Sequence, residues 1–216
     1  MVLVRVNDDY WSWKKWAFAH GALINEMTRF ADLAFAFIPA QPRRVSTIGG
    51  KDANHVVSIE YSDGSLACIF ATPFGSFGHP KELAEVYHNG AVIVIDHLVE
   101  LRVAGVADQP FRTTFPVLGD RQPWIEASGI EGYYRRVQAT QQEALEKGNN
   151  SILPGWPDKG HYALVDDLVR SIEHGFEPVC SPGIAAVPTA VILRALESEA
   201  QSGAPVEIRP ENYSVP

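Results

Sequence analysis

The spacing of apolar residues changes twice along this chain, from a helical repeat to the alternation of strands and back. Residues 2–6, VLVRV, have the composition of a short strand. Five apolar residues then recur at helical spacing within residues 21–38, before Pro39: Leu23, Met27, Phe30, Ala34 and Phe37. This pattern predicts a short strand followed by a largely buried helix.

The middle third contains at least seven short runs that are rich in β-branched and aromatic residues. They are residues 43–49, 55–61, 65–72, 81–88, 91–97, 99–105 and 110–115. The dipeptides Asp63-Gly64 and Asn89-Gly90 lie between runs and favour the positive φ angles of tight hairpins. The runs therefore predict an antiparallel meander.

The last third returns to helical spacing, over residues 132–147, 162–174 and 184–202, and ends in a strand-like run at 205–208. The second helix has one apolar stripe: Leu164, Val165, Leu168, Val169 and Ile172. Strand, helix, seven strands, three helices and strand define an α+β fold. We expect an open, mainly antiparallel mixed sheet of about seven to nine strands, with helices packed on one face.

Two of the predicted strands, residues 66–71 and 91–95, are apolar at every position. Such strands are typical of a sheet that is covered on both faces. Helices on one face leave the other face open, so we expect a homo-oligomer that forms through the open sheet face. The alternative is that the long segment 116–159 folds over that face.

Composition narrows the class of protein. A chain of 216 residues is one ordinary domain, and it needs neither a disulfide between its two cysteines nor a metal to hold a core. The net charge of −8 argues against a nucleic-acid partner or an anionic membrane surface. No signal-like start and no run of about 18 apolar residues occur, so we expect a cytoplasmic protein without a membrane span.

Several chemical signatures are absent. The sequence contains no GxGxxG, no GxxxxGK[ST], no GxSxG and no CxxC. His88 and His97 flank a predicted hairpin strand, but about 20 Å of extended chain separates them, which is too far for a shared ion. We therefore expect neither a metal nor a cofactor to be bound by this chain alone.

Polar residues interrupt the first helix on one side. Asn25, Arg29 and Asp32 form a stripe, and Glu26 lies beside it. Carboxylate, amide and guanidinium groups together can hold a polyol or an anionic substrate and direct a proton, since polar groups on an apolar helix need partners or a cavity. The alternative is a simple ion pair between Arg29 and Asp32 on a solvated edge.

Two other segments carry candidate ligand-binding side chains. Trp11, Trp13 and Trp16 lie together after the first strand, where they either stack on sugar rings or anchor a partner. Lys159 and His161, in DKGHY, precede the second of the late helices, and His161 either reaches into a site or lies on the surface. We take Trp13, Asn25, Lys159 and His161 as candidates for substrate binding.

The order of motifs resembles the C-terminal domain of the Gfo/Idh/MocA oxidoreductases over nearly the whole chain. The segments that carry the resemblance are VRVNDDYWSWKKW, HGALINEMTRFADLAFAFI, PRRVSTIG, NHVVSIEYSDGSLACIF, HNGAVIVIDH, DKGHYALVDDLVRSIEHGFEPVCSP and ILRALESEAQSGAPVEI. The resemblance implies one such domain over residues 1–216. It divides into an opening strand and Trp-rich loop (1–20), helix plus sheet (21–115), a loop and helix segment (116–159), helices with the closing strand (160–208) and a tail (209–216).

The resemblance also implies a substrate pocket at the first long helix and assembly through the sheet. In that family a separate Rossmann domain binds NAD(P) and supplies a lysine from a Glu-Lys-Pro motif, which this chain lacks. A histidine and an acid of the C-terminal domain help to take the hydroxyl proton of a sugar or polyol. Here Arg29 stands at the histidine position and Asp32 at the acid, with Asn25 and Glu26 upstream. Arginine stays protonated, so Arg29 is no general base.

Three functions remain open at this level. The first is a substrate-binding and oligomerising subunit of an NAD(P)-dependent sugar or polyol dehydrogenase, joined to a separately encoded nucleotide-binding partner. The second is a non-catalytic carbohydrate-binding scaffold or sensor. The third is cofactor-independent lyase or epimerase chemistry on a keto-sugar. Glu26, Arg29 and Asp32 are the candidate catalytic residues, and in the third case Glu26 or His161 would act as base while Arg29 stabilises an enolate.

Overall fold

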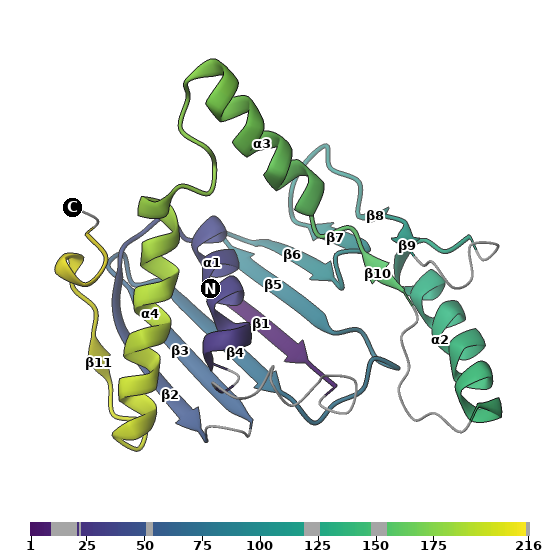
Figure 1. The fold of residues 1–216 in the computed structure, drawn as a ribbon, viewed down its shortest axis with the longest axis horizontal. Helices are drawn as coiled ribbons and strands as arrows, with labels where there is room; N and C mark the ends of the chain where they lie inside the picture. Colours follow the sequence, from purple (N-terminus) through teal and green to yellow (C-terminus); the bar gives the residue numbers. More distant parts are fainter. Residues whose placement is uncertain (10–20, 22, 51–53, 119–125, 148–154, 215–216) are drawn as a thin grey trace.

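The computed structural model of the chain describes residues 1–9, 21, 23–50, 54–118, 126–147 and 155–214. In these residues one open sheet of nine strands dominates the fold (Figure 1), in the spatial order β11-β2-β3-β4-β1-β5-β6-β7-β8. The strands are β1 (Val2–Asn7), β2 (Pro42–Gly49), β3 (His55–Tyr61), β4 (Leu66–Thr72), β5 (Glu82–His88), β6 (Ala91–Asp96), β7 (Glu100–Ala104), β8 (Arg112–Thr114) and β11 (Val206–Glu207). The predicted α+β class and the open, mainly antiparallel mixed sheet are confirmed.

The first strand occupies the middle of the sheet. β1 runs parallel to β4 and antiparallel to β5, and its residues Val2, Val4 and Val6 are each only 1% exposed. The predicted continuous meander is therefore wrong at one point, because β1 lies between β4 and β5. Every second residue of β1 is a buried valine, which suits a central position with a strand on each side.

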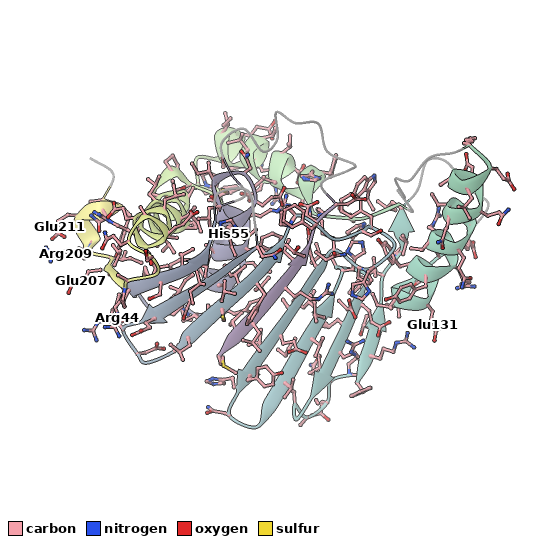
Figure 2. All side chains as sticks on the ribbon, turned by 90° about the horizontal axis from the view of Figure 1, so that it is seen from below. Arg44, His55, Glu131, Glu207, Arg209 and Glu211 are labelled. Atoms are coloured by element: carbon pink, nitrogen blue, oxygen red, sulfur yellow. The ribbon has the colours of Figure 1, made fainter. Side chains whose placement is uncertain are left out.

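Two helices cover one face of this sheet (Figure 2). A π-helical turn, Leu23–Met27, leads into α1 (Thr28–Phe37), and α4 (Pro182–Ala200) lies beside α1 over β2. Their buried residues, among them Phe30, Ala34 and Val191, join the inward valines and isoleucines of the sheet in one core. The sequence pattern placed both helices correctly but did not reveal the π turn at the start of the first.

A second, smaller core closes the far edge of the sheet. There α2 (Gly129–Glu146) packs near β8 and the short pair β9 (Val117–Leu118) and β10 (Trp156–Pro157). Its buried centre is Val99, Val117 and Tyr133. The described part of the 116–159 segment thus lies at an edge, and Ile48 and Phe70 on the open face stay 71% and 46% exposed. The outer face of β4 is not covered within the described chain, as expected for a sheet that carries its helices on one face.

The helix α3 (His161–His174) departs from the expectation that the helices pack on one face. Figure 1 shows it standing off the sheet, between β10 and α4. Ser171 is its one buried residue, whereas Leu164 and Ile172 of the predicted apolar stripe are 51% and 75% exposed. The periodicity identified the helix correctly, but not the surface that its apolar stripe requires.

The predicted turns are present. Asn89 and Gly90 both have positive φ, 44° and 81°, and connect β5 to β6 by a two-residue loop. Gly64 has φ 83° between β3 and β4. Among the described residues, no helix is both long enough and apolar enough to cross a bilayer.

Candidate functional site

Charged side chains meet under the helical layer at one end of the sheet. The carboxyl end of β1 leads directly into Asp8, and the residue before β5 is Lys81, on the strand that pairs with β1. Lys81 Nζ lies 2.8 Å from Asp8 Oδ2 and 3.4 Å from Glu26 Oε2 of the π turn. The side chains of Lys81, Asp8 and Glu26 are 4%, 5% and 10% exposed, so this acid–lysine–acid cluster is almost withdrawn from water.

The cluster is an unusual structure for a protein interior. Withdrawing ions from water costs several kcal/mol each, and their attraction offsets this cost only where geometry and hydrogen bonds are good. Burial raises the pKa of the Glu26 carboxyl, although the positive charges of Lys81 and Arg29 oppose that change. A carboxyl group with a raised pKa, held beside an ammonium group, is suited to exchanging a proton with a bound molecule.

Arg29 connects this cluster to the surface. Its side chain is 46% exposed, and its guanidinium donates a hydrogen bond to Glu26 Oε2, three residues earlier. The sequence allows an ion pair between Arg29 and Asp32 as an alternative. In the structure Arg29 instead pairs with Glu26. Asn25 and Asp32 are exposed, so the polar stripe presents Asn25, Arg29 and Asp32 outward while Glu26 points inward.

His97 borders the cluster from the end of β6. Its Nδ1 accepts a hydrogen bond from the backbone N–H of Lys81 at 3.2 Å, so in the neutral ring the proton resides on Nε2. Nε2 is buried without a hydrogen-bond partner among the described residues, and the ring meets the edge of Tyr133 at 4.4 Å. Burial lowers the pKa of His97 to about 4, so the ring is neutral near pH 7.

The backbone at His97 is also unusual. His97 and Leu98 have φ angles of 50° and 56°, in the left-handed region that residues other than glycine rarely adopt. Such positions cost roughly 1–3 kcal/mol each and concentrate at functional sites. A hydrogen bond from Val99 N–H to the carbonyl of Asp96 closes this turn between β6 and β7, and the turn places His97 against Lys81.

Lys159 belongs to the same end of the sheet. Its Nζ lies 2.6 Å from Glu82 Oε1, at the first residue of β5, immediately after Lys81. His161 is the first residue of α3 and is exposed, close to Lys159 in sequence, and its side chain has no hydrogen bond or ion pair with the residues that the structure describes. Trp13 lies outside the described residues. The structure thus brings Glu26, Arg29 and Lys159 to one end of the sheet and leaves Asn25, Asp32 and His161 on the surface.

Among the described residues, two of the hollows have room for a small molecule. One, of about 540 Å³, adjoins Lys159 and is mostly apolar, with Ile95, Leu101 and Phe115 in its wall and Asp158 and Gly160 at its rim. It lies on the partly covered region of the helical side of the sheet. The candidate site therefore combines a buried polar cluster with an apolar hollow close by.

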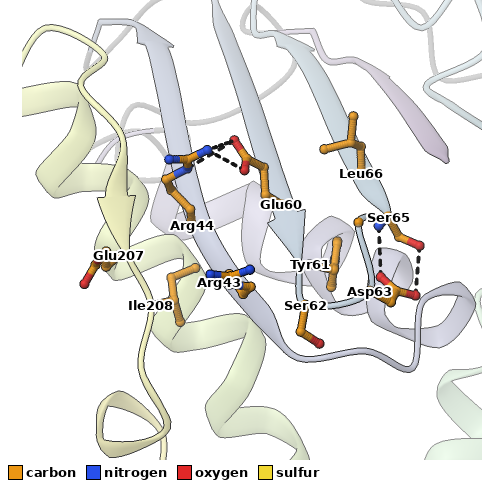
Figure 3. Close-up of a pocket in the computed structure, with 11 residues that line it drawn as sticks. Arg43, Arg44, Glu60, Tyr61, Ser62, Asp63, Ser65, Leu66, Glu207 and Ile208 are labelled. Carbon is orange, nitrogen blue, oxygen red and sulfur yellow. Dashed lines mark hydrogen bonds and ion pairs between the residues drawn. The ribbon is translucent and has the colours of Figure 1, made fainter.

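The second hollow, of about 700 Å³, lies at the opposite edge of the sheet, between β11, β2 and the β3–β4 turn (Figure 3). Its charges are largely compensated, since Arg44 pairs with Glu60 at 2.6 Å and Glu207 with Arg209 at 2.8 Å. It has no connection to the acid–lysine–acid cluster. We therefore place the candidate site at the Lys81 end.

A glycine-containing loop lies beside the cluster, and its packing explains its composition. The glycine of FGSFGH that approaches the cluster, Gly75, packs against β1, because a Cβ there would lie 1.6 Å from Asn7 Oδ1. Gly75 is thus required for the close packing of its loop against β1. It does not precede a helix, as the glycines of a phosphate-binding loop do. Within the described residues no three His, Cys, Asp or Glu side chains gather in a geometry for a metal ion.

The fold and the cluster together define a class of protein: an α+β domain whose open sheet carries helices on one face and a buried cluster of charged side chains at one end. No family model matches the sequence, and no curated protein matches it. Solved structures do match in fold.

Three solved structures illustrate this similarity. The UDP-N-acetylglucosamine 3-dehydrogenase of Acidithiobacillus ferrooxidans aligns with a TM-score of 0.61 at 11% identity, over 91% of this chain and 52% of its own. A levoglucosan dehydrogenase in complex with NADH and L-sorbose aligns at 0.60 and 16%, over 96% and 58%. The myo-inositol dehydrogenase of Corynebacterium glutamicum ATCC 13032 aligns at 0.57 and 16%, over 97% and 56%.

These alignments confirm that the chain shares its fold with part of each of these three dehydrogenases, and identities of 11–16% carry no more than the fold. The chain spans 52–58% of the length of these three structures. The remainder of each has no counterpart in the aligned chain.

Sequence patterns alone missed Asp8, Lys81 and the role of His97. Each lies within one residue of a strand end, where the change from apolar strand to charged side chain is visible in VRVNDD, PKELAEV and VIVIDH. Lys81 and His97 flank the two strands of one hairpin, but Asp8 is 73 residues from Lys81, and their meeting depends on β1 entering the sheet beside β5. Only that topology brings them together.

Proposed function

We propose that this chain is the substrate-binding and oligomerising part of an NAD(P)-dependent oxidoreductase acting on a sugar or polyol, completed by a separate nucleotide-binding partner. The observation that carries the proposal is the fold match, which takes up 91–97% of this chain but little more than half of each dehydrogenase. The absence of GxGxxG and Glu-Lys-Pro from the sequence supports the need for a partner.

The acid–lysine–acid cluster then handles the substrate proton. Glu26 is the proposed acceptor of the hydroxyl proton, because burial raises the pKa of its carboxyl and Lys81 holds it in place. Lys81 acts as a positioning residue between Asp8 and Glu26. Arg29, half exposed at the mouth of the cluster, binds a hydroxyl or anionic group of the substrate. The hydride chemistry belongs to the nucleotide of the partner.

Two further features complete the proposal. The open sheet face, with Ile48 and Phe70 exposed, is the proposed homo-oligomer contact. Both cysteines are free, which fits the proposed cytoplasmic location. Asp32 remains a proposed catalytic residue, Asn25, Lys159 and His161 remain proposed substrate contacts, and Trp13 is proposed as a substrate contact on sequence grounds.

Ligand titration tests the first half of this proposal. The purified chain is titrated with myo-inositol, levoglucosan, L-sorbose and UDP-N-acetylglucosamine by calorimetry. We expect binding of one of these classes, and Arg29→Ala should weaken it by about 10-fold or more, as lost charge-assisted hydrogen bonds do. Arg135→Ala, an exposed arginine on α2, is the matched control and should leave affinity unchanged.

Nucleotide titration tests the second half. The isolated chain should bind neither NADH nor NADPH at about 1 mM, the upper end of usual Michaelis constants. Saturable binding of either nucleotide would overturn the split-enzyme proposal, since it would give the chain the function assigned to its partner.

A second candidate function is a non-catalytic carbohydrate-binding scaffold or sensor. The observation that favours it is Arg29 itself, which is permanently charged and occupies the position where the resembled family has a histidine. This alternative predicts ligand binding that needs Arg29 and no turnover with any nucleotide-binding partner. Turnover that Glu26→Gln removes would exclude it.

A further inference from the structure

Helix α3 exposes more apolar surface than an isolated protein normally tolerates. Five side chains of one stripe are 46–75% exposed: Leu164, Val165, Leu168, Val169 and Ile172. Phe176, Val179 and Ile184 continue the exposure after the helix, at 42%, 75% and 52%. A contiguous apolar band of this kind usually marks an interaction site.

The stripe does not face the body of its own chain. At about 100° per residue, Asp167 and Ser171 lie along one edge of α3, and the stripe is centred roughly 110° farther round. Ser171 is the buried residue of the helix, and Asp167 Oδ2 accepts the backbone N–H of Val179 at 2.7 Å. The helix therefore rests on the chain by this polar edge and presents its apolar face elsewhere.

Charges beside the stripe limit what can cover it. Asp166 and Glu173 fall along the edge next to Val169, and neither forms an ion pair among the described residues. A two-fold pair of α3 helices would bring this acidic edge against its own copy, between two chains of net charge −8. The same acidic charge opposes an anionic membrane surface. The complementary occupant is a different protein with lysine or arginine around an apolar patch.

The stripe also begins next to the candidate site. α3 starts two residues after Lys159, which is bound to Glu82 beside the cluster, and the apolar hollow of about 540 Å³ has Asp158 and Gly160 in its wall. A helix of 14 residues extends about 21 Å from there. A protein that covers the stripe therefore also reaches the hollow and the edge of the cluster.

We propose that the apolar stripe of α3, together with the apolar hollow at its start, is the docking surface for the nucleotide-binding partner, a separate protein whose contact patch is apolar with a basic rim. This inference rests on the proposed function, which supplies the identity of the occupant. The solved dehydrogenases are consistent with a partner of substantial size, because 42–48% of each of them has no counterpart in this chain. Docking there would place the partner's nucleotide beside the substrate cluster.

Photo-cross-linking in the native host tests the surface. Benzoylphenylalanine replaces Leu168, within the stripe, or Arg170, which lies on nearly the opposite side of the same helix. We expect the Leu168 position to form an adduct with a protein other than this chain, one that binds NAD(P)H when purified, and the Arg170 position to form little. Equal adducts from both positions, or an adduct with a second copy of the chain, would overturn the proposal.

Charged substitutions provide the second measurement. Leu168→Asp combined with Ile172→Asp should lower co-purification of the cross-linked partner at least about 10-fold, whereas Arg170→Asp should not. All three positions are exposed, so the variants should keep the wild-type unfolding midpoint. Co-sedimentation of the wild type with vesicles of phosphatidylcholine and phosphatidylglycerol, lost in the double variant, would contradict the proposal in favour of a membrane contact.

The failures of the two proposals can be told apart. If a nucleotide-binding partner co-purifies equally with the double variant, the docking surface is wrong and the proposed function stands. If the isolated chain binds NAD(P)H, the proposed function fails whatever the cross-links show.

Discussion

Replacing Lys81 by methionine should destabilise the fold more than replacing any exposed lysine. Methionine keeps most of the length of the side chain and removes its charge, so Asp8 and Glu26 would face each other in a site where they are 5% and 10% exposed. Removing one partner of a buried ion pair typically costs 3–5 kcal/mol, because the remaining charge stays buried and uncompensated. Arg29 remains on one side of Glu26 and moderates the loss, so we expect about 3 kcal/mol near pH 7.

Urea unfolding followed by circular dichroism measures this loss. With a denaturant slope of about 2 kcal/mol/M, a loss of about 3 kcal/mol lowers the midpoint by roughly 1.5 M. Lys147→Met is the matched control, since Lys147 pairs with Glu143 on the surface with its side chain 68% exposed, and it should change stability by less than about 0.5 kcal/mol.

The pH dependence gives this prediction a second, independent measure. The pKa of Glu26 is raised in the folded state, so the folded protein binds its proton more readily than the unfolded chain does, and the contribution of Glu26 to stability declines as pH rises above about 4.5. Lys81→Met should steepen this decline, so the stability that this variant loses relative to the wild type should shrink toward pH 4. Adding Glu26→Gln to Lys81→Met should restore part of the lost stability near pH 7. A loss below about 1 kcal/mol at pH 7, or a deficit independent of pH, would refute the assignment of a buried, coupled cluster.

Three further outcomes follow from other parts of the molecule. Burial lowers the pKa of His97 to about 4, so His97 stays neutral in the folded protein while the unfolded chain takes up a proton near pH 6.5. The free energy of unfolding should therefore fall by about 3 kcal/mol as pH drops from 6.5 to 4. His97→Phe should flatten that part of the curve of urea midpoint against pH. Gly75→Ala should lower the free energy of unfolding by more than about 2 kcal/mol, because the added Cβ would lie 1.6 Å from Asn7 Oδ1. Gly183→Ala in α4 is the control: no atom lies nearer than 4.0 Å to its Cβ position, so it should be neutral or slightly stabilising in the same assay. Phe70→Glu on the open sheet face should shift the proposed homo-oligomer to monomer in light scattering, and an unchanged mass would exclude that face as the contact.

The elements that sequence predicts well here are those with strong local signals. The hairpin at Asn89-Gly90 follows from the positive φ that these residues accept, and the helices α2, α3 and α4 begin within three residues of their predicted starts. The first helix begins as a π turn, a change in hydrogen bonding that apolar spacing does not encode. Local patterns thus gave element type and approximate bounds.

Sheet order is harder because it depends on contacts between distant segments. β1 has the same pattern of alternate apolar residues at an edge or at the centre of a sheet, and nothing within VLVRV distinguishes the two. Its place beside β5 decides that Asp8 meets Lys81, which is 73 residues away. Periodicity reveals the polar stripe of the first helix, together with Glu26 and Arg29. It does not reveal Lys81, the buried partner of Glu26.

Several features that cost this fold stability lie at one end of the sheet. They lie where β1 ends and where Lys159 pairs with Glu82. They are the buried Lys81 cluster, the left-handed backbone at His97 and the start of the exposed apolar stripe of α3. At the opposite edge, Arg44 and Glu60 form an exposed pair and Gly64 supplies the turn, both inexpensive solutions. An apolar replacement of a buried ion cluster is often more stable, so stability alone does not explain its presence. Strain and unpaired surface concentrated in one place, on an otherwise consistent fold, are what binding and proton exchange require.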